Sequence, residues 1–154
     1  MRNSWKTSQA VIVDANVAVW AVLPVLAEVQ TVDLFEGWTE KDVEVLAPSF
    51  WIAEACSVVR RMAYQKKLTM EESEEAIEHL FGLQIRSIPM TVSLCLRALS
   101  WAASLQQIRL YDSLYIAAAE QQSAVLWSGD KRLINRLRQC RFSNVQSVFE
   151  LEEA

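Results

Sequence analysis

The hexapeptide Val11-Ile12-Val13-Asp14-Ala15-Asn16 decides how this chain is expected to fold. Its first three residues are β-branched and form a short apolar run, which is typical of a strand buried on both faces. Asp14 follows the run directly, and a helix-period stretch begins at Asn16. Strand, acid and helix in this order indicate the first unit of a parallel α/β sheet, with Asp14 at the carboxyl end of its first strand.

Apolar runs and helix-period stretches alternate along the rest of the chain. We expect strands at 10–13, 43–47, 84–88 and 124–127, with a short fifth at 145–148. We expect helices at 16–23, 25–38, 69–82, 91–106 and 129–138, one that Pro48 and Ser49 open and that runs to about Lys66, and one from Tyr111 or Asp112 to Gln122. Strands that alternate with helices pair in parallel, because each crossover covers a face of the sheet. The sequence therefore predicts an α/β fold: a single three-layer α/β/α domain with a mostly parallel central sheet of four to five strands.

The length and charge of the chain limit the classes of protein to consider. The 154 residues suffice for one domain, which we place at 10–150 behind a flexible N-terminal arm at 1–9. A net charge of −4 argues against a duplex-DNA binder with a broad basic face. We expect no membrane span, because Asp14, Asn16 and Pro24 interrupt the apolar stretch 10–27.

Cysteine and histidine usage narrows the chemistry further. Cys56, Cys95 and Cys140 lie far apart and form no C-x-x-C motif, so we expect structural thiols in a reducing, cytoplasmic setting. His79 is the only histidine and sits in an acidic helical stretch. Zinc sites and Ser-His-Asp or Cys-His catalysis need a histidine with partners. Reactivity must therefore come from carboxylates, lysines or a bound metal ion.

Four acids stand where parallel strands deliver functional side chains. Asp14 follows the first strand, Asp130 comes three residues after Trp127 at the end of the fourth, and Asp112 begins a helix. Glu54 is expected about two turns into the helix after the second strand, among small and apolar neighbours. Because ligands bind outside the carboxyl ends of parallel strands, the four are expected to meet at one edge. Acids gathered there would repel one another, and oxygen ligands suit Mg²⁺ or Mn²⁺.

Each acid also has a plainer interpretation. Asp14 and Asp112 fit helix N-caps, and Asp130 in Ser-Gly-Asp fits a turn residue. Glu54 is harder to explain in this way, because an unpaired buried carboxylate costs several kcal/mol. It needs a partner, a shifted pKa or a cation.

The order and spacing of four segments carry a resemblance to a known family. The segments are 11–16, 47–58 with Glu54, Tyr111-Asp112-Ser113-Leu114-Tyr115-Ile116-Ala117, and Trp127-Ser128-Gly129-Asp130-Lys131-Arg132-Leu133. Together they span nearly the whole chain, which resembles PIN domains and, among these, the VapC-type toxins of prokaryotic toxin–antitoxin pairs.

The resemblance implies roles for individual residues. Asp14, Glu54, Asp112 and Asp130 would be the metal-binding and catalytic acids, and Asn16 and Ser128 the polar residues that support them. It implies an Mg²⁺- or Mn²⁺-dependent endoribonuclease that leaves a 5′-phosphate, an antitoxin partner and a homodimer. One departure is Gly129, where bulkier residues are frequent; we expect it to loosen the loop that aims Asp130.

An RNA substrate needs positive charge around this acidic centre. Lys131, Arg132 and Arg136 follow Asp130 closely and are candidate phosphate contacts, although a solvated helix face explains them equally well. The main alternative function is a catalytically inactive PIN-like module that binds RNA or protein. An aspartyl-phosphate enzyme is less favoured because Asn16 occupies the position of its usual second aspartate, and no G-x-G-x-x-G supports a dinucleotide site.

Overall fold

The computed structural model describes residues 10–23, 31–107 and 109–150. In these residues five strands form one sheet: β1 (Ala10–Val13), β2 (Glu44–Pro48), β3 (Ile85–Ile88), β4 (Val125–Ser128) and β5 (Val145–Ser147). The strand order is β3-β2-β1-β4-β5, and every pair is parallel. The predicted parallel α/β sheet is thus confirmed, and it has five strands where four to five were predicted. The arm predicted at 1–9 lies outside the described residues.

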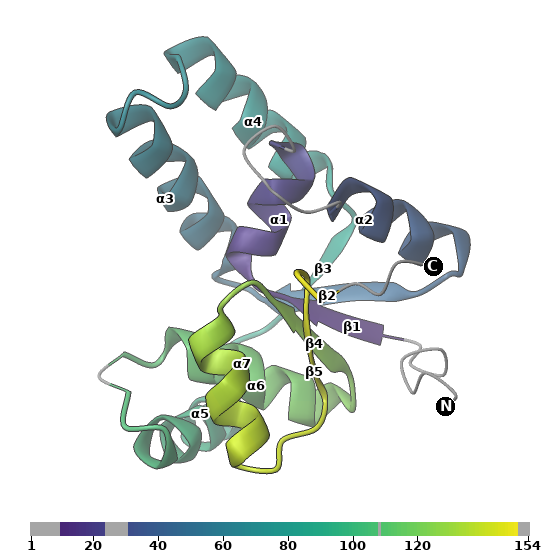
Figure 1. The fold of residues 1–154 in the computed structure, drawn as a ribbon, viewed down its shortest axis with the longest axis vertical. Coiled ribbons are helices and arrows are strands. Elements are labelled where there is room, and N and C mark those ends of the chain that lie inside the picture. Colours follow the sequence, from purple (N-terminus) through teal and green to yellow (C-terminus); the bar gives the residue numbers. More distant parts are fainter. Residues whose placement is uncertain (1–9, 24–30, 108, 151–154) are drawn as a thin grey trace.

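Helices cover both faces of this sheet, which confirms the three layers (Figure 1). On one side lie α1 (Ala15–Val22), α2 (Thr31–Glu40), α3 (Trp51–Tyr64) and α4 (Met70–Gly82). On the other lie α5 (Val92–Ser104), α6 (Tyr111–Gln122) and α7 (Lys131–Gln139). The first part of the helix predicted at 25–38 lies outside the described residues.

The alternating side chains of the strands explain why both faces are covered. Val11 and Val13 pack with Trp38 and Trp127 in one cluster, whereas Ile12 belongs to the other, larger cluster. Ile12 pairs with Leu46 of β2 and with Leu126 of β4, and all three are buried. A sheet with two apolar faces is stable only between two layers of helices.

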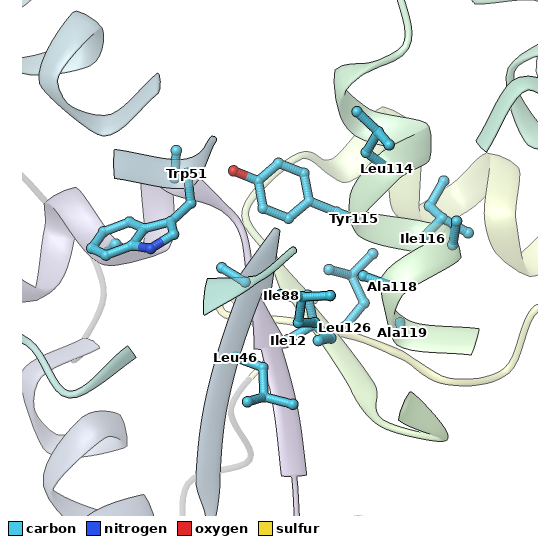
Figure 2. Packing of buried hydrophobic residues seen from close by; sticks show 14 of the residues in the cluster. Ile12, Leu46, Trp51, Ile88, Leu114, Tyr115, Ile116, Ala118, Ala119 and Leu126 are labelled. Atoms are coloured by element: carbon cyan, nitrogen blue, oxygen red, sulfur yellow. The ribbon is translucent and has the colours of Figure 1, made fainter. Parts of the chain in front are cut away.

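Helix α6 is the central helix of its layer. It contacts β1, β2 and β4 above and α5 beside it. Residues 113–119 are all buried, including the run of three alanines from Ala117 to Ala119. Their small side chains let the helix backbone approach the sheet closely, which fixes Asp112 in the first turn near the carboxyl ends of the strands. Figure 2 shows Tyr115, Ile116, Ala118 and Ala119 in the core formed with Ile12, Leu46, Ile88 and Leu126.

The prediction that Pro48 and Ser49 open the third helix was wrong. Pro48 is the last residue of β2 and pairs with Ile88, while the Ser49 amide donates to the Ile88 carbonyl at 2.8 Å. The missing N–H of Pro48 costs no bond to β1, because the β1–β2 pairing ends at Leu46. Helix α3 therefore begins at Trp51, and Glu54 lies in its first turn, closer to the sheet edge than predicted.

The strand order reverses at β1. From β1 the chain adds β2 and β3 on one side of the sheet, and it then adds β4 and β5 on the other side of β1. Ligand sites of open parallel sheets lie at such a reversal, outside the carboxyl ends of the strands. In the described part of the chain no helix combines the length and the apolar character needed to cross a bilayer.

Candidate active site

Asp14 is held at the junction of β1 and β4. Its backbone amide donates to the Trp127 carbonyl at 3.3 Å. As N-cap of α1, its Oδ1 accepts the Val17 amide at 2.9 Å, and its Oδ2 accepts the Ser128 hydroxyl at 2.6 Å. The N-cap interpretation of Asp14 is therefore correct, but capping occupies only one of the two carboxylate oxygens. The other is oriented by a buried hydroxyl group from a different strand.

Ser128 links Asp14 to Asp130. Its side chain is fully buried, and its Oγ also accepts the backbone amide of Asp130 at 3.1 Å. Asp130 in turn caps α7, since its Oδ1 accepts the amides of Arg132 at 3.0 Å and Leu133 at 3.1 Å. Asp130, for which a turn residue was the plainer interpretation, is thus a helix N-cap. Its other oxygen, Oδ2, takes no part in these two bonds.

Glu54 and Asp112 reach the same region from the first turns of α3 and α6. Glu54 Oε1 accepts the hydroxyl of Tyr115 at 3.1 Å. Asp112 is the second residue of α6, whose N-cap is Leu110, so the N-cap interpretation does not apply to it. Both carboxyls have raised pKa values, chiefly because burial disfavours their charged forms.

The four acids are near enough to influence one another electrostatically. Burial raises the pKa of Asp14 to about 6, the hydrogen bonds from Ser128 and Val17 oppose that rise, and the charges of Asp112 and Glu54 add to it. Asp112 likewise raises the pKa of Glu54, and Asp130 raises that of Asp112. Among the described residues the ion pairs of Lys, Arg and His involve other acids, namely Glu44, Glu75, Glu120 and Glu150. The four carboxylates therefore lack cationic side-chain partners there.

These oxygen ligands fit a hard divalent cation. Within the described ranges no three His, Cys, Asp or Glu side chains are close enough to ligate a single ion together. Mg²⁺ commonly binds one or two carboxylates directly and keeps several waters, so a closed cluster of three acids is not required. Repulsion between carboxylates also favours their separation when no cation neutralises them.

The other predicted site residues are exposed on the first turn of α1 and on α7. Asn16 is exposed in the first turn of α1, and none of the hydrogen bonds formed by the described residues joins it to the four acids. Lys131, Arg132 and Arg136 are exposed on α7 directly after Asp130. The Lys131 ammonium lies 5.2 Å from the centroid of the Phe149 ring.

Gly129, which was expected to loosen the Asp130 loop, leaves no empty space beside it. A Cβ atom on Gly129 would lie 2.3 Å from Cη2 and 2.4 Å from Cζ3 of Trp20. The indole ring of Trp20 thus covers the glycine, and it packs edge-on against Phe149 with ring centroids 5.7 Å apart. The aromatic ring of Trp20 from α1 therefore occupies the space that a side chain at position 129 would take.

Sequence reasoning did not single out Tyr115 as a site residue. It lies in the stretch 111–117 and follows Asp112 by three positions, which places both on one face of α6. Burial raises the pKa of its hydroxyl, which therefore keeps its proton. A usable signal was present, because a tyrosine among small apolar residues needs a hydrogen-bond partner for its buried hydroxyl.

The comparison with protein families bears directly on this arrangement. The sequence model described as PIN domain matches residues 11–138, most of the chain. The chain belongs to the PIN-domain family. PIN domains are generally nucleases, and they generally use divalent metal ions. A comparison with curated protein sequences gives no match.

Two solved structures have the same fold as this PIN domain. One is the crystal structure of VapBC2 from Rickettsia felis bound to a DNA fragment from their promoter, with a TM-score of 0.62, 15% identity, and coverage of 90% of this chain and 98% of that chain. The other is a toxin–antitoxin complex from Klebsiella pneumoniae, with a TM-score of 0.63, 11% identity, and coverage of 92% and 99%. At these identities the likeness establishes the fold alone.

Removing the Ser128 hydroxyl tests how this PIN domain holds its acids. Ser128→Ala is expected to lower the free energy of unfolding by about 1–3 kcal/mol, because Asp14 Oδ2 and the Asp130 amide each lose a buried partner. Urea unfolding in EDTA at pH 7.5 measures the change. The matched control is Ser100→Ala at an exposed serine of α5. Equal stability of the two variants would contradict the proposed role of the hydroxyl.

Proposed function

We propose that this protein is an Mg²⁺- or Mn²⁺-dependent endoribonuclease, the toxin of a type II toxin–antitoxin pair in the cytoplasm. The observation that carries the proposal is the electrostatic coupling of Asp14, Glu54, Asp112 and Asp130. Each acid comes from a different segment of the chain, and the charges of neighbouring acids help to raise the pKa values of Asp14, Glu54 and Asp112. No cationic side chain of the described residues neutralises the four acids. Membership of a family that generally consists of nucleases supports the same reaction class.

The side chains divide the work of binding and orientation. Asp14 and Asp112 would hold the cation, with Glu54 and Asp130 acting directly or through water. When bound, a divalent cation lowers the pKa of a ligated water and offsets negative charge on the phosphate. Asp14 is oriented for this role by Ser128 and Val17, and Asp130 is fixed by its two bonds to α7. Carboxylates held in place before the substrate arrives need little reorganisation during the reaction.

Exposed cations beside Asp130 supply an approach for the RNA backbone. Arg132 and Arg136 project from α7, and neither is part of an ion pair formed by the described residues. Arg138 differs, because its guanidinium binds Glu150 at 2.8 Å. We therefore assign phosphate contacts to Lys131, Arg132 and Arg136 and leave Arg138 as a structural residue. Such contacts would steer a polyanion toward an enzyme whose net charge is −4.

The fold shared with two toxin–antitoxin complexes supports an antitoxin as protein partner. Homodimerisation stays a prediction from the family resemblance. The alternative function, an inactive PIN-like module that binds RNA or protein, is favoured only by the absence of a three-acid cluster at ligation distance in the described residues. It predicts binding of RNA without cleavage.

The direct test is incubation of the purified protein with tRNA and rRNA in Mg²⁺ or Mn²⁺. We expect new RNA fragments with 5′-phosphate ends, loss of cleavage in EDTA, and no cleavage by Asp112→Asn, which keeps the shape of the side chain but removes its charge. Equal cleavage by the variant would point to a contaminating nuclease and contradict the proposal. RNA binding without cleavage by the unsubstituted protein would favour the inactive module.

A further inference from the structure

Tyr115 bridges from α6 to the acid on α3. Its side chain is only 2% exposed, and its hydroxyl donates to Oε1 of Glu54 at 3.1 Å. In Figure 2 the hydroxyl oxygen points away from α6 toward the backbone at Trp51, where α3 begins. Because Glu54 lies in that first turn, the bond spans two helices that come from opposite sides of the sheet.

The same hydroxyl lies near the segment that carries Asp14. The backbone amide of Ala15, the first residue of α1, is close enough to oppose the rise in the pKa of this hydroxyl. That amide belongs to the first turn of a helix, where N–H groups have no partner within the helix itself. One hydroxyl group on α6 thus binds the acid at the start of α3 and lies near the start of α1.

Packing alone does not explain a tyrosine at this position. The ring lies edge-on against Phe50 at a centroid distance of 5.3 Å, a contact that phenylalanine would make equally well. A buried hydroxyl costs free energy unless it is hydrogen-bonded, so its net contribution here depends on its bond to Glu54. What the hydroxyl adds is a directional hydrogen bond, which holds one oxygen of the flexible Glu54 carboxylate in place.

Fixing Oε1 determines where the other oxygen of Glu54 points. Among the described residues Oε2 has no hydrogen-bond partner, while Asp14 and Asp112 are close enough to Glu54 for electrostatic interaction. Groups that hydrogen-bond to metal ligands orient those ligands, and their loss typically lowers metal affinity about 10- to 100-fold.

We propose that Tyr115 is a positioning residue for divalent-cation binding, acting through the Glu54 carboxylate. This inference rests on the proposed function, because it assigns a task within the same acidic site. It adds a residue that carries no charge and would not itself touch the cation.

The test compares Mn²⁺ affinity in variants of the full chain, by titration calorimetry at pH 7.5 after removal of metals. Tyr115→Phe is expected to bind Mn²⁺ about 10-fold or more weakly than the unsubstituted protein. Tyr111→Phe is the matched control, since it removes an exposed hydroxyl one turn earlier on α6. Ile88→Val is a second control that removes one buried methyl group from the same core and changes no polar atom. Both controls are expected to keep the affinity within about twofold.

Melting in EDTA accompanies each titration to separate stability from metal binding. The inference is overturned if Tyr115→Phe keeps the unsubstituted affinity, or if Ile88→Val loses as much affinity as Tyr115→Phe. Absence of Mn²⁺ binding by the unsubstituted protein would instead overturn the proposed function itself, and this inference with it. If Tyr115→Phe does not fold, Tyr115→Met with the same two readouts replaces it, because methionine fills irregular core space and has no hydrogen-bond donor.

Discussion

Asp14→Asn is expected to lower metal-dependent RNA cleavage by about a thousandfold while making the metal-free protein harder to unfold. The first effect follows because a catalytic metal lowers the activation barrier by several kcal/mol, and each 1.36 kcal/mol is about tenfold in rate. Asparagine caps helices as well as aspartate does, so the bond to the Val17 amide can be kept. Its amide group can donate to the Ser128 hydroxyl in place of the bond that Oδ2 now accepts.

The gain in stability follows from the electrostatics of the site. Burial and two neighbouring carboxylates raise the pKa of Asp14 from 3.8 to about 6, which measures how strongly the fold disfavours its charge. Removing that charge is expected to raise the free energy of unfolding at pH 8 by about 1–3 kcal/mol, at 1.36 kcal/mol per pKa unit with allowance for partial exposure.

Two measurements check this pair of effects. Single-turnover cleavage in Mn²⁺ gives the loss of activity, and urea unfolding in EDTA gives the gain in stability. Asp33→Asn makes the same chemical change at an exposed position of α2 and should alter neither. A variant that loses activity together with stability would indicate a folding defect and contradict the assignment of Asp14 to the metal site.

Mn²⁺ is expected to stabilise the protein strongly at pH 7.5 and much less at pH 5. At 100 times its dissociation constant, a ligand that binds only the folded state adds about 2.7 kcal/mol, or roughly 5–10 °C in Tm for a chain of this size. At pH 5 Asp14 is largely protonated, because its pKa is about 6. The proton competes with the cation, and at the same Mn²⁺ concentration the added stability should fall to about half or less.

The metal-free protein should show the opposite trend with pH. The folded pKa of Asp14 lies above its unfolded value, so between pH 4 and pH 6 the unfolded chain releases this proton first. The contribution of Asp14 to stability is present below about pH 4 and is lost as pH rises through about 6; Glu54 and Asp112 shift in the same direction. Thermal melts in EDTA and in Mn²⁺ across pH 4.5–8 measure both curves. Parallel curves with a constant offset would contradict cation binding by these carboxylates.

Most of the backbone architecture could be predicted from local sequence patterns. The runs at 10–13 and 124–127 mark β1 and β4 to within one residue, because a strand buried on both faces must be apolar throughout. The error at Pro48 shows the limit of such patterns. Proline opens helices and also ends strands, and only the pairing of β2 with its neighbours distinguished the two.

The candidate acids were also visible in the sequence, but their contacts were not. The plain helix-cap and turn interpretations could be weighed for Asp14 and Asp130, but no local pattern indicated that capping uses only one of the two carboxylate oxygens of each acid. Gly129 looked like a gap in the loop, because its filling by Trp20 depends on how α1 packs beside the end of β4.

By itself the sequence determined the alternation of strands and helices, the parallel sheet and the presence of acids near the ends of its strands, since these follow from local periodicity and composition. Only the tertiary structure decided which side chains hold those acids: Ser128 bonds to Asp14 across 114 positions of sequence, and Tyr115 to Glu54 across 61. The physical reason is that a hydrogen bond of about 3 Å depends on how distant elements pack, and no local preference of the chain encodes that distance.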